Sequence, residues 1–263
     1  MLTRLSSVEI TVVVVVLLFG ATGIGIWFGR ILSRRKGGLR EPLGVVQAAL
    51  VGLVALLLAF GLTMAVERYE TRRAAVVLEA NAIGTTYLRA ETLGEPMRSK
   101  SLALLKQYAD ARIALSESVP DSGRFVAASQ QSVKLQNSLW ALADEAMNAA
   151  PVASAPRLYV ESLNEMIDAH TTRIAALDNR IPSPVLWLQL LASALALGIL
   201  GMLLASHERG VLMALLASGL VAVMVLVIID LDRPHRGMIT VPDGALVAVR
   251  QSMNEPPAAA GSS

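Results

Sequence analysis

Two carboxylates near the end of an apolar run are the first candidates for chemistry in this sequence. Asp230 and Asp232 lie in the stretch "VIIDLDRPHRG", with Arg233 and Arg236 close behind them. A carboxylate at the end of a membrane span is costly unless it is paired or hydrated. The two carboxylates could bind a cation, but no third ligand is visible beside them. The simpler interpretation is a cap at the membrane interface, with Pro234 ending the helix.

The histidines and the common motifs offer no catalytic arrangement. His170, His207 and His235 fit neither the HxxxH nor the HExxH spacing. The sequence has no GxSxG, P-loop or GxGxxG motif and no cysteine, which excludes thiol catalysis and thiolate metal sites. His170 falls in an apolar helix seam, where we expect a buried, neutral side chain facing Arg73 or Val76. We predict no enzyme, no metal site and no cofactor.

A further group of polar side chains shares one face of a predicted helix. It consists of Arg68, Arg72, Glu79, Thr86 and Arg89, at helical spacing. The simpler interpretation is a face exposed to solvent. The alternative is a polar pathway or a subunit contact at the mouth of a membrane pore, because the group begins directly after an apolar run.

The composition indicates a membrane protein with a smaller polar part. Hydrophobic residues make up 54% of the chain and charged residues 17%, whereas soluble domains have about 25% charged residues. A formal net charge of +2 gives no sign of nucleic-acid binding. Four stretches have the roughly 20 apolar residues that a spanning helix needs: Val8 to Phe28, Leu43 to Val66, Val185 to Ala205 and Val211 to Ile229. The first is too long for the core of a signal peptide, so we interpret it as a retained span.

The region between the second and third spans shows the three-four spacing of amphipathic helices. The first helix continues the second span to Ala90, where "GEP" ends it. A second carries Met97 and Leu115, a third runs from about Arg124 to Ala149, and a fourth has a seam from Val160 to Ile181. Each helix has one apolar stripe, and burying these stripes together makes a bundle.

The predicted fold class is therefore all-α, a four-span transmembrane protein with a helical bundle inserted between spans two and three. We expect a hairpin over residues 1–66, the bundle over 67–184, a second hairpin over 185–231, and a C-terminal segment over 232–263 whose end is disordered. Span two and the first bundle helix form one rod, about 70 Å long at 1.5 Å per residue. The glycines of "GATGIG" at residues 20–25 predict close helix packing, and Gly25 and Gly29 add a GxxxG step.

Two stretches of this sequence, "RYETRRAAVVLEANAIGTTYLRAETL" and "IIDLDRPHRGMITV", resemble a bacterial family of membrane proteins described as bestrophin-like. The matching positions include Arg68, Tyr69, Glu79, Asn81, Gly84, Arg89, Asp230, Asp232, Arg233, Pro234 and Gly237. The resemblance covers nearly the whole chain.

The resemblance implies a function. Bestrophins are pentameric anion channels whose second span continues into a long helix and lines the pore. By analogy, this chain would form a homo-oligomer, a pentamer, that conducts small inorganic anions across a lipid bilayer. The sequence departs from bestrophins in lacking a recognisable calcium clasp or neck motif. The alternative is a non-conducting membrane sensor or interaction module whose bundle binds a ligand or a partner.

If the chain forms a channel, span two supplies the candidate residues. One face of the span carries Leu53, Leu57, Phe60 and Met64. These side chains either pack against neighbouring spans or, in a ring of subunits, form a hydrophobic constriction. Arg68 and Arg72, just beyond the span, would raise the local anion concentration at the mouth.

The loop between spans one and two carries five basic residues from Arg30 to Arg40. The positive-inside rule places this loop in the cytoplasm and the bundle outside it, in the cell (inner) membrane. The bestrophin analogy predicts the reverse, a cytoplasmic bundle. Arg68, Arg72 and Arg73 support that reverse orientation.

Overall fold

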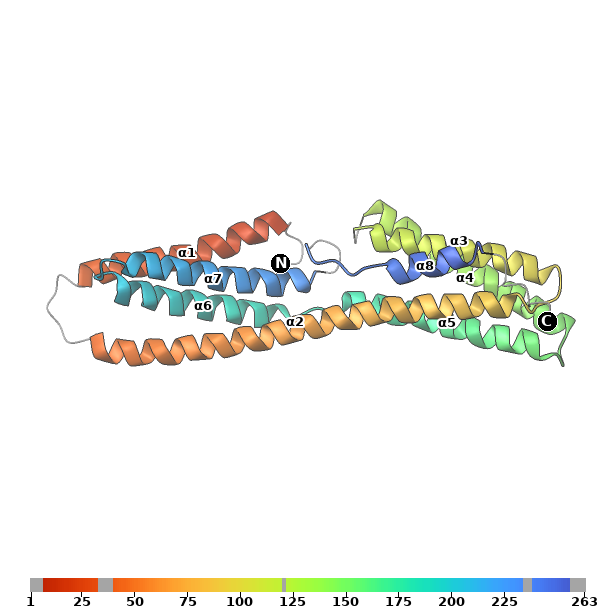
Figure 1. The fold of residues 1–263 in the computed structure, drawn as a ribbon, viewed down its shortest axis with the longest axis horizontal. Coiled ribbons are helices and arrows are strands. Elements are labelled where there is room, and N and C mark those ends of the chain that lie inside the picture. Colours follow the sequence, from red (N-terminus) through yellow and green to blue (C-terminus); the bar gives the residue numbers. More distant parts are fainter. Residues whose placement is uncertain (1–6, 33–39, 120–121, 234–237, 256–263) are drawn as a thin grey trace, which may run out of the picture. The chain divides into compact units, whose positions relative to one another are not determined.

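The computed structural model describes residues 7–32, 40–119, 122–233 and 238–255, and all regular structure within these ranges is helical (Figure 1). The predicted all-α fold class is confirmed. The helices are α1 (Ser7–Leu32), α2 (Arg40–Ala90), α3 (Met97–Glu117), α4 (Gly123–Ala149), α5 (Ser154–Asp178), α6 (Ser183–Leu204), α7 (Gly210–Leu231) and α8 (Gly244–Ser252). Four of them, α1, α2, α6 and α7, contain stretches long and apolar enough to cross a membrane.

The chain divides into two compact units. The span unit comprises residues 1–69 and 180–239, and the bundle unit comprises residues 70–179 and 240–263. Helix α2 contributes to both units, because it continues without a break from Arg40 to Ala90 (Figure 1). No proline interrupts it after its first turn, so every later residue can donate its backbone N–H to the helix.

In the span unit, α1 packs mainly against α6 and α7. Glycines allow α1 and α6 to touch, because a Cβ added to Gly25 would lie 1.9 Å from the Gly198 carbonyl oxygen. A Cβ on Gly29 would lie 2.2 Å from the carbonyl oxygen of Met202. The predicted close packing is therefore confirmed at Gly25 and Gly29, and it is typical of helices that associate in lipid through small residues. It is wrong for Gly20 and Gly23, where an added Cβ would have no neighbour within 4 Å.

Polar side chains join the spans at three further points. Thr22 Oγ1 lies 2.7 Å from Ser218 Oγ, between α1 and α7. Gln47 Nε2 on α2 donates to the Ala196 carbonyl oxygen on α6 over 3.0 Å. In the opposite direction, Gln189 Nε2 on α6 donates to the Leu57 carbonyl oxygen over 2.8 Å. Such bonds satisfy polar groups where water is scarce and fix the register of neighbouring helices.

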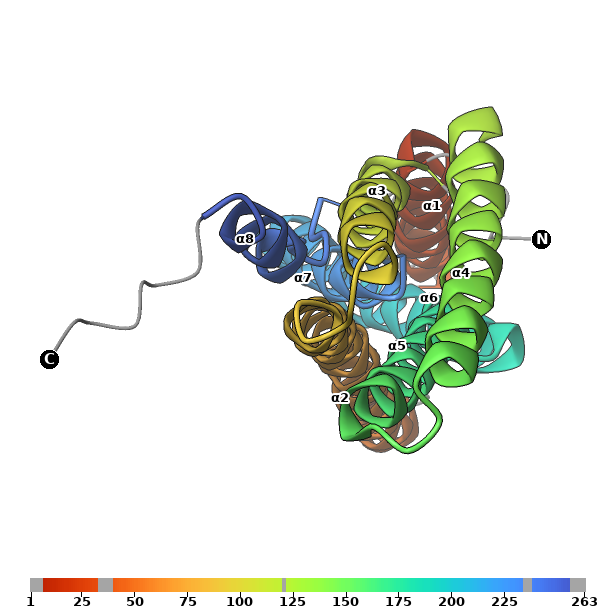
Figure 2. The same ribbon diagram turned by 90° about the vertical axis from the view of Figure 1, so that its right-hand side faces the viewer.

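In the bundle unit, the second part of α2 joins α3, α4 and α5 around an apolar core (Figure 2). Its fully buried side chains include Ile83, Leu105, Tyr108, Leu139, Leu163 and Met166. Helix α4 begins at an N-cap, because Ser122 Oγ accepts a hydrogen bond from the Phe125 backbone N–H. The three-four spacing of apolar residues predicted these helices.

Helix α5 differs in detail from the predicted fourth bundle helix. It ends at Asp178, and Ile181 lies beyond it, buried in the apolar core of the span unit. Of the expected seam, Leu163 is fully buried, but Ile167, Ile174 and Leu177 are only half-buried. The fully buried face is rotated by about one residue and includes Arg173, which a pattern of apolar residues cannot reveal.

Helix α8 was not predicted and lies within the expected C-terminal segment. It packs beside α3 in the bundle unit (Figures 1 and 2). Leu246 is fully buried, Arg250 Nε donates to Asp110 Oδ1 over 2.7 Å, and the Met253 carbonyl oxygen accepts from Tyr87 over 3.0 Å. The predicted disordered tail covers residues 254–263, of which 256–263 lie outside the described residues.

Candidate functional site

The candidate constriction lies on a side of α2 that the chain leaves largely uncovered. Leu53 is 50% exposed and Phe60 is 59% exposed, while Leu57 and Met64 are half-buried. The most apolar part of α2 is only 22% buried within the chain, against 33% for each of the other three spans. Lipid or neighbouring subunits must therefore cover α2 more than any other span.

The two arginines proposed for a pore mouth have different surroundings. Arg68 is half-buried, and its Nη1 donates to the Met64 carbonyl oxygen one turn earlier over 3.1 Å. Arg72 is only 1% exposed. It donates to the carbonyl oxygens of Ala176 over 3.3 Å and Asn179 over 2.8 Å. The last carbonyl oxygens of a helix have no partner within the helix, so the positively charged Arg72 side chain stabilises the C-terminal end of α5.

The other members of the polar group also face α5. Thr86 Oγ1 lies 2.9 Å from the Ser162 carbonyl oxygen, and Arg89 Nη1 donates to the Leu158 carbonyl oxygen over 2.9 Å. Arg89 also lies 3.6 Å from Glu161. The interpretation of this group as a solvent-exposed face is therefore wrong for Arg72 and Thr86, which are buried.

Glu79 completes this contact between α2 and α5, which we call the polar seam; its members on α2 are Arg72, Glu79, Thr86 and Arg89. Glu79 is fully buried, so a solvent-exposed position is wrong for this residue as well. The buried members recur every seven residues, a spacing that keeps them on one helix face. The predicted helical periodicity of the polar group was correct, but these residues face α5 in the interior of the bundle unit rather than solvent.

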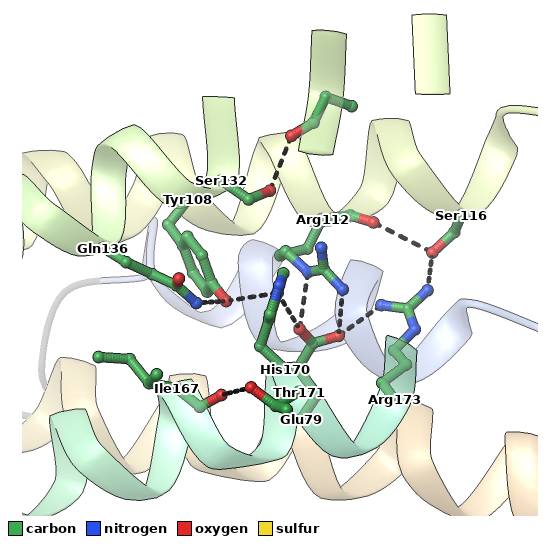
Figure 3. A network of polar contacts seen from close by, with 11 residues as sticks. Glu79, Tyr108, Arg112, Ser116, Ser132, Gln136, Ile167, His170, Thr171 and Arg173 are labelled. Atoms are coloured by element: carbon green, nitrogen blue, oxygen red, sulfur yellow. Dashed lines mark hydrogen bonds and ion pairs between the residues drawn. The ribbon is translucent and has the colours of Figure 1, made fainter. Parts of the chain in front are cut away.

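Two arginines from different helices bind the Glu79 carboxylate (Figure 3). Arg112 on α3 places Nε 2.6 Å from Oε1 and Nη2 3.4 Å from Oε2. Arg173 on α5 donates through Nη1 to Oε2, and through Nη2 to Ser116 Oγ. The carboxylate therefore ties α2 to both α3 and α5. Such charge-assisted bonds to a buried carboxylate are stronger than bonds between neutral groups.

A chain of polar contacts through His170, Tyr108 and Gln136 extends from the same carboxylate. His170 Nδ1 lies 3.7 Å from Glu79 Oε1 and 3.4 Å from the Tyr108 hydroxyl, which accepts from Gln136 Nε2 over 3.0 Å. These side chains come from α2, α3, α4 and α5, and they point toward one another (Figure 3). His170 therefore faces α2 as predicted, with its side chain 12% exposed. Its partner is Glu79, however, rather than Arg73 or Val76.

The electrostatic surroundings fix the charge state of Glu79. Burial by itself raises the pKa of this carboxyl, but the nearby His170 side chain and the charges of Arg112 and Arg173 outweigh that effect. Together they lower the pKa of Glu79 to about 2. Burial raises the pKa of Tyr108, and the nearby Glu79 charge raises it further, so the phenol stays protonated. Glu79 follows the apolar run of α2, which ends at Val66, and Tyr108 lies on α3, so neither residue is in an apolar span.

Sequence reasoning missed Arg112 and Arg173. One signal was present, because Arg112 lies four residues after Tyr108 and three before Leu115, on the apolar face of its helix. An arginine at such a position requires buried acceptors, such as a carboxylate or backbone carbonyl oxygens. The sequence offers Glu79 on a neighbouring helix, but the pairing follows only from the three-dimensional packing.

The C-terminal carboxylates bind backbone amides. Asp232 Oδ1 accepts from the Ile181 N–H over 2.8 Å, and Asp232 is only 5% exposed. Asp230 accepts from the N–H groups of Met238 over 2.8 Å and Ile239 over 2.9 Å. Arg233 is buried as well, and Pro234 lies outside the described residues. Among described side chains, no three of the types His, Cys, Asp and Glu come together as a metal site.

Two further family positions, Asn81 and Gly84, line a groove of about 730 Å³ between α2 and α8. Asn81 is exposed on one wall, and Gly84 lies beside Val249, where a Cβ would come within 2.8 Å of the valine side chain. Tyr69 is elsewhere, half-buried against the apolar core of the span unit. The family motif is therefore distributed over the polar seam, this groove and the end of α7.

Comparison with known proteins supports one family. The profile described as "Bestrophin-like domain" matches residues 14–246. A crystal structure of a bacterial bestrophin homolog from Klebsiella pneumoniae is similar, with 11% sequence identity and a TM-score of 0.69 over 89% of this chain and 96% of that chain. A structure described as a membrane protein gives 11% identity and a TM-score of 0.68, over 95% and 99%. At these identities, the structural likeness concerns the fold. No functionally curated protein matches the sequence.

Proposed function

Since the chain belongs to the bestrophin-like family, we propose that it forms a homo-oligomeric ion channel, non-enzymatic, with α2 lining the pathway. The pentamer is the assembly that the bestrophin analogy favours. We place the channel in the cell (inner) membrane, and four membrane-spanning helices support a membrane location. Small inorganic anions are the proposed cargo.

One observation carries this proposal: α2 is the span that its own chain covers least, yet it is also the longest helix. A span whose apolar surface is so little covered by its own chain can pack against the same span of neighbouring subunits around a symmetry axis. Leu53 and Phe60 would then point toward the pathway and form a constriction that gates by excluding water. Leu57 and Met64 would support them from the edge facing the other spans.

The proposal for anion preference rests on Arg68. Arg72 is enclosed by the end of α5, so Arg68 is the better candidate for a charge felt by a passing ion. A positive charge at a narrow mouth concentrates anions, and salt screens the effect. Glu67 and Glu70 are exposed on the same helix, and their negative charges oppose this concentration of anions.

The experiment is a current measurement on purified full-length protein in liposomes with asymmetric chloride. We expect currents whose reversal potential follows chloride, a larger leak in Phe60→Ala, and reduced anion preference in Arg68→Glu. Glu67→Gln is the matched charge control and should increase the preference. A silent protein across voltage, pH and calcium would refute the channel proposal.

The second candidate is a sensor or interaction module, which the α2–α8 groove favours. Its walls include Asn81, Thr85, Leu88, Ala248 and Ser252, a mixture of small, polar and apolar side chains. A partner seated there would contact both helices without passing ions. Absence of current together with saturable binding at this groove would establish this function instead.

A further inference from the structure

A pocket of about 290 Å³ lies among α2, α6 and α7 of the span unit, and we call it the α2–α6–α7 pocket. Most of its wall is aliphatic: Val54, Leu58, Leu197, Leu200, Leu220 and Met224. Val54 and Leu58 project about 120° and about 160° around α2 from Phe60, because successive residues turn by about 100° around a helix. An occupant of this pocket would therefore contact α2 away from the proposed ion pathway.

Two polar side chains interrupt this apolar wall, Gln47 and Ser193. Gln47 is 6% exposed and Ser193 is fully buried. The Gln47 Nε2 donates to the Ala196 carbonyl oxygen, which can only accept, so Nε2 is fixed there and Oε1 is the free end. Neither Gln47 Oε1 nor Ser193 Oγ has a hydrogen-bond partner among the residues that the structure describes.

An unsatisfied polar atom within a membrane span is costly, and it needs a partner that reaches it. Water alone does not suit this pocket. A water molecule occupies about 30 Å³ and needs two to four polar partners, whereas the pocket has about 290 Å³ and two free polar atoms. A plain hydrocarbon chain would fill the volume and leave both atoms unsatisfied.

We propose that the α2–α6–α7 pocket binds a small amphiphile with an aliphatic body and a single hydroxyl head. The hydroxyl donates to Gln47 Oε1 and accepts from the Ser193 hydroxyl, while the body packs on Leu58, Leu197 and Met224. The volume lies close to the lower end of small-molecule pockets, about 300–1,000 Å³, so a medium-length chain fits. This site is separate from the proposed channel pathway and stands without it.

The test uses a photoreactive octanol that carries a diazirine on its chain. Full-length protein in liposomes is irradiated with this probe, and mass spectrometry locates the adducts. We expect adducts on the pocket walls in α2, α6 or α7. Unlabelled 1-octanol should compete, and octane at the same mole fraction in the membrane should compete about tenfold less, since it lacks the hydroxyl.

Matched variants separate this site from a general lipid crevice. Gln47→Leu combined with Ser193→Ala should reduce labelling about tenfold, and Ser193→Thr, which keeps a hydroxyl, should retain it. Gln189→Leu removes a similar amide from the same pair of helices outside the pocket, so its labelling should stay as in the wild type. Helical content and melting temperature serve as the folding check. Labelling elsewhere, equal competition by octane, or unchanged labelling of a folded double variant would overturn the proposal.

Discussion

Glu79 and Arg112 form an ion pair that is closed to solvent, with both side chains 0% exposed and Arg112 Nε 2.6 Å from Glu79 Oε1. The pair joins α2 to α3, and Arg173 adds α5 through the second carboxylate oxygen. Three helices of the bundle unit therefore share one carboxylate. Because Glu79 is the partner that both arginines share, removing its charge leaves Arg112 and Arg173 buried without compensation.

Glu79→Gln should destabilise the protein strongly. The amide has nearly the same shape but cannot balance Arg112 and Arg173, and breaking a buried pair in this way costs about 3–5 kcal/mol. Thermal unfolding of the full chain, followed by circular dichroism, measures the loss. Glu70→Gln is the control, because Glu70 forms an exposed pair with Arg73 at 3.7 Å and such pairs contribute little. Equal melting temperatures for both variants would show that the buried cluster does not stabilise the fold.

The same carboxylate predicts a dependence of stability on pH. The pKa of Glu79 falls from its ordinary value of 4.5 to about 2 in the folded protein. A lowered pKa stabilises the folded state above pH 4.5, and this contribution, about 3 kcal/mol, disappears as the pH falls toward 2. The melting temperatures of wild type and Glu79→Gln should therefore converge between pH 5 and pH 2. A constant difference over that range would contradict the assigned pKa.

Arg72→Met should destabilise the bundle unit by about 1–3 kcal/mol, because the carbonyl oxygens of Ala176 and Asn179 lose their donor. Arg73→Met is the matched control on the adjacent residue, since the Arg73 side chain is 57% exposed. Urea unfolding of both variants compares them under one condition. If Arg73→Met proves the more damaging, Arg72 does not hold the end of α5.

Membrane orientation is a further prediction. The positive-inside rule places the basic loop in the cytoplasm and the bundle outside it. The natural chain has no cysteine, so single cysteines report cleanly. Ser138→Cys, at an exposed position of α4, should react with an impermeant maleimide on intact cells, and Ser33→Cys in the basic loop should not. The opposite labelling pattern would support the orientation that the bestrophin analogy favours.

Much of the fold follows from hydrophobic patterns. Runs of about 20 apolar residues predicted the four spans, and three-four spacing predicted the bundle helices, because both patterns reflect burial along a single element. Gly25 and Gly29 likewise predicted a close contact, although the partner on α6 was unknown. These features depend on local sequence, which a single chain displays directly.

The buried polar contacts could not be predicted in the same way. Glu79 and Arg72 look like surface residues in the sequence, since their burial is tolerable only beside partners far along the chain. Arg173 shifts the buried face of α5 for the same reason. Helix α8 is short, and the role of its stripe of Leu246, Val249 and Met253 is clear only when the helix is packed against α2 and α3. A single sequence therefore does not determine which helices pack together or which of their polar side chains form pairs.

The proposal that α2 lines an ion pathway is tested most directly by thiol block of the current. Phe60→Cys and Ala59→Cys lie at nearly the same depth, and both positions are exposed in one chain, but about 100° apart around the helix. In liposomes, a water-soluble thiol reagent should block chloride current through Phe60→Cys and spare Ala59→Cys. Block of Ala59→Cys alone, or of neither variant, would contradict the assignment of the Leu53 and Phe60 face to the pathway.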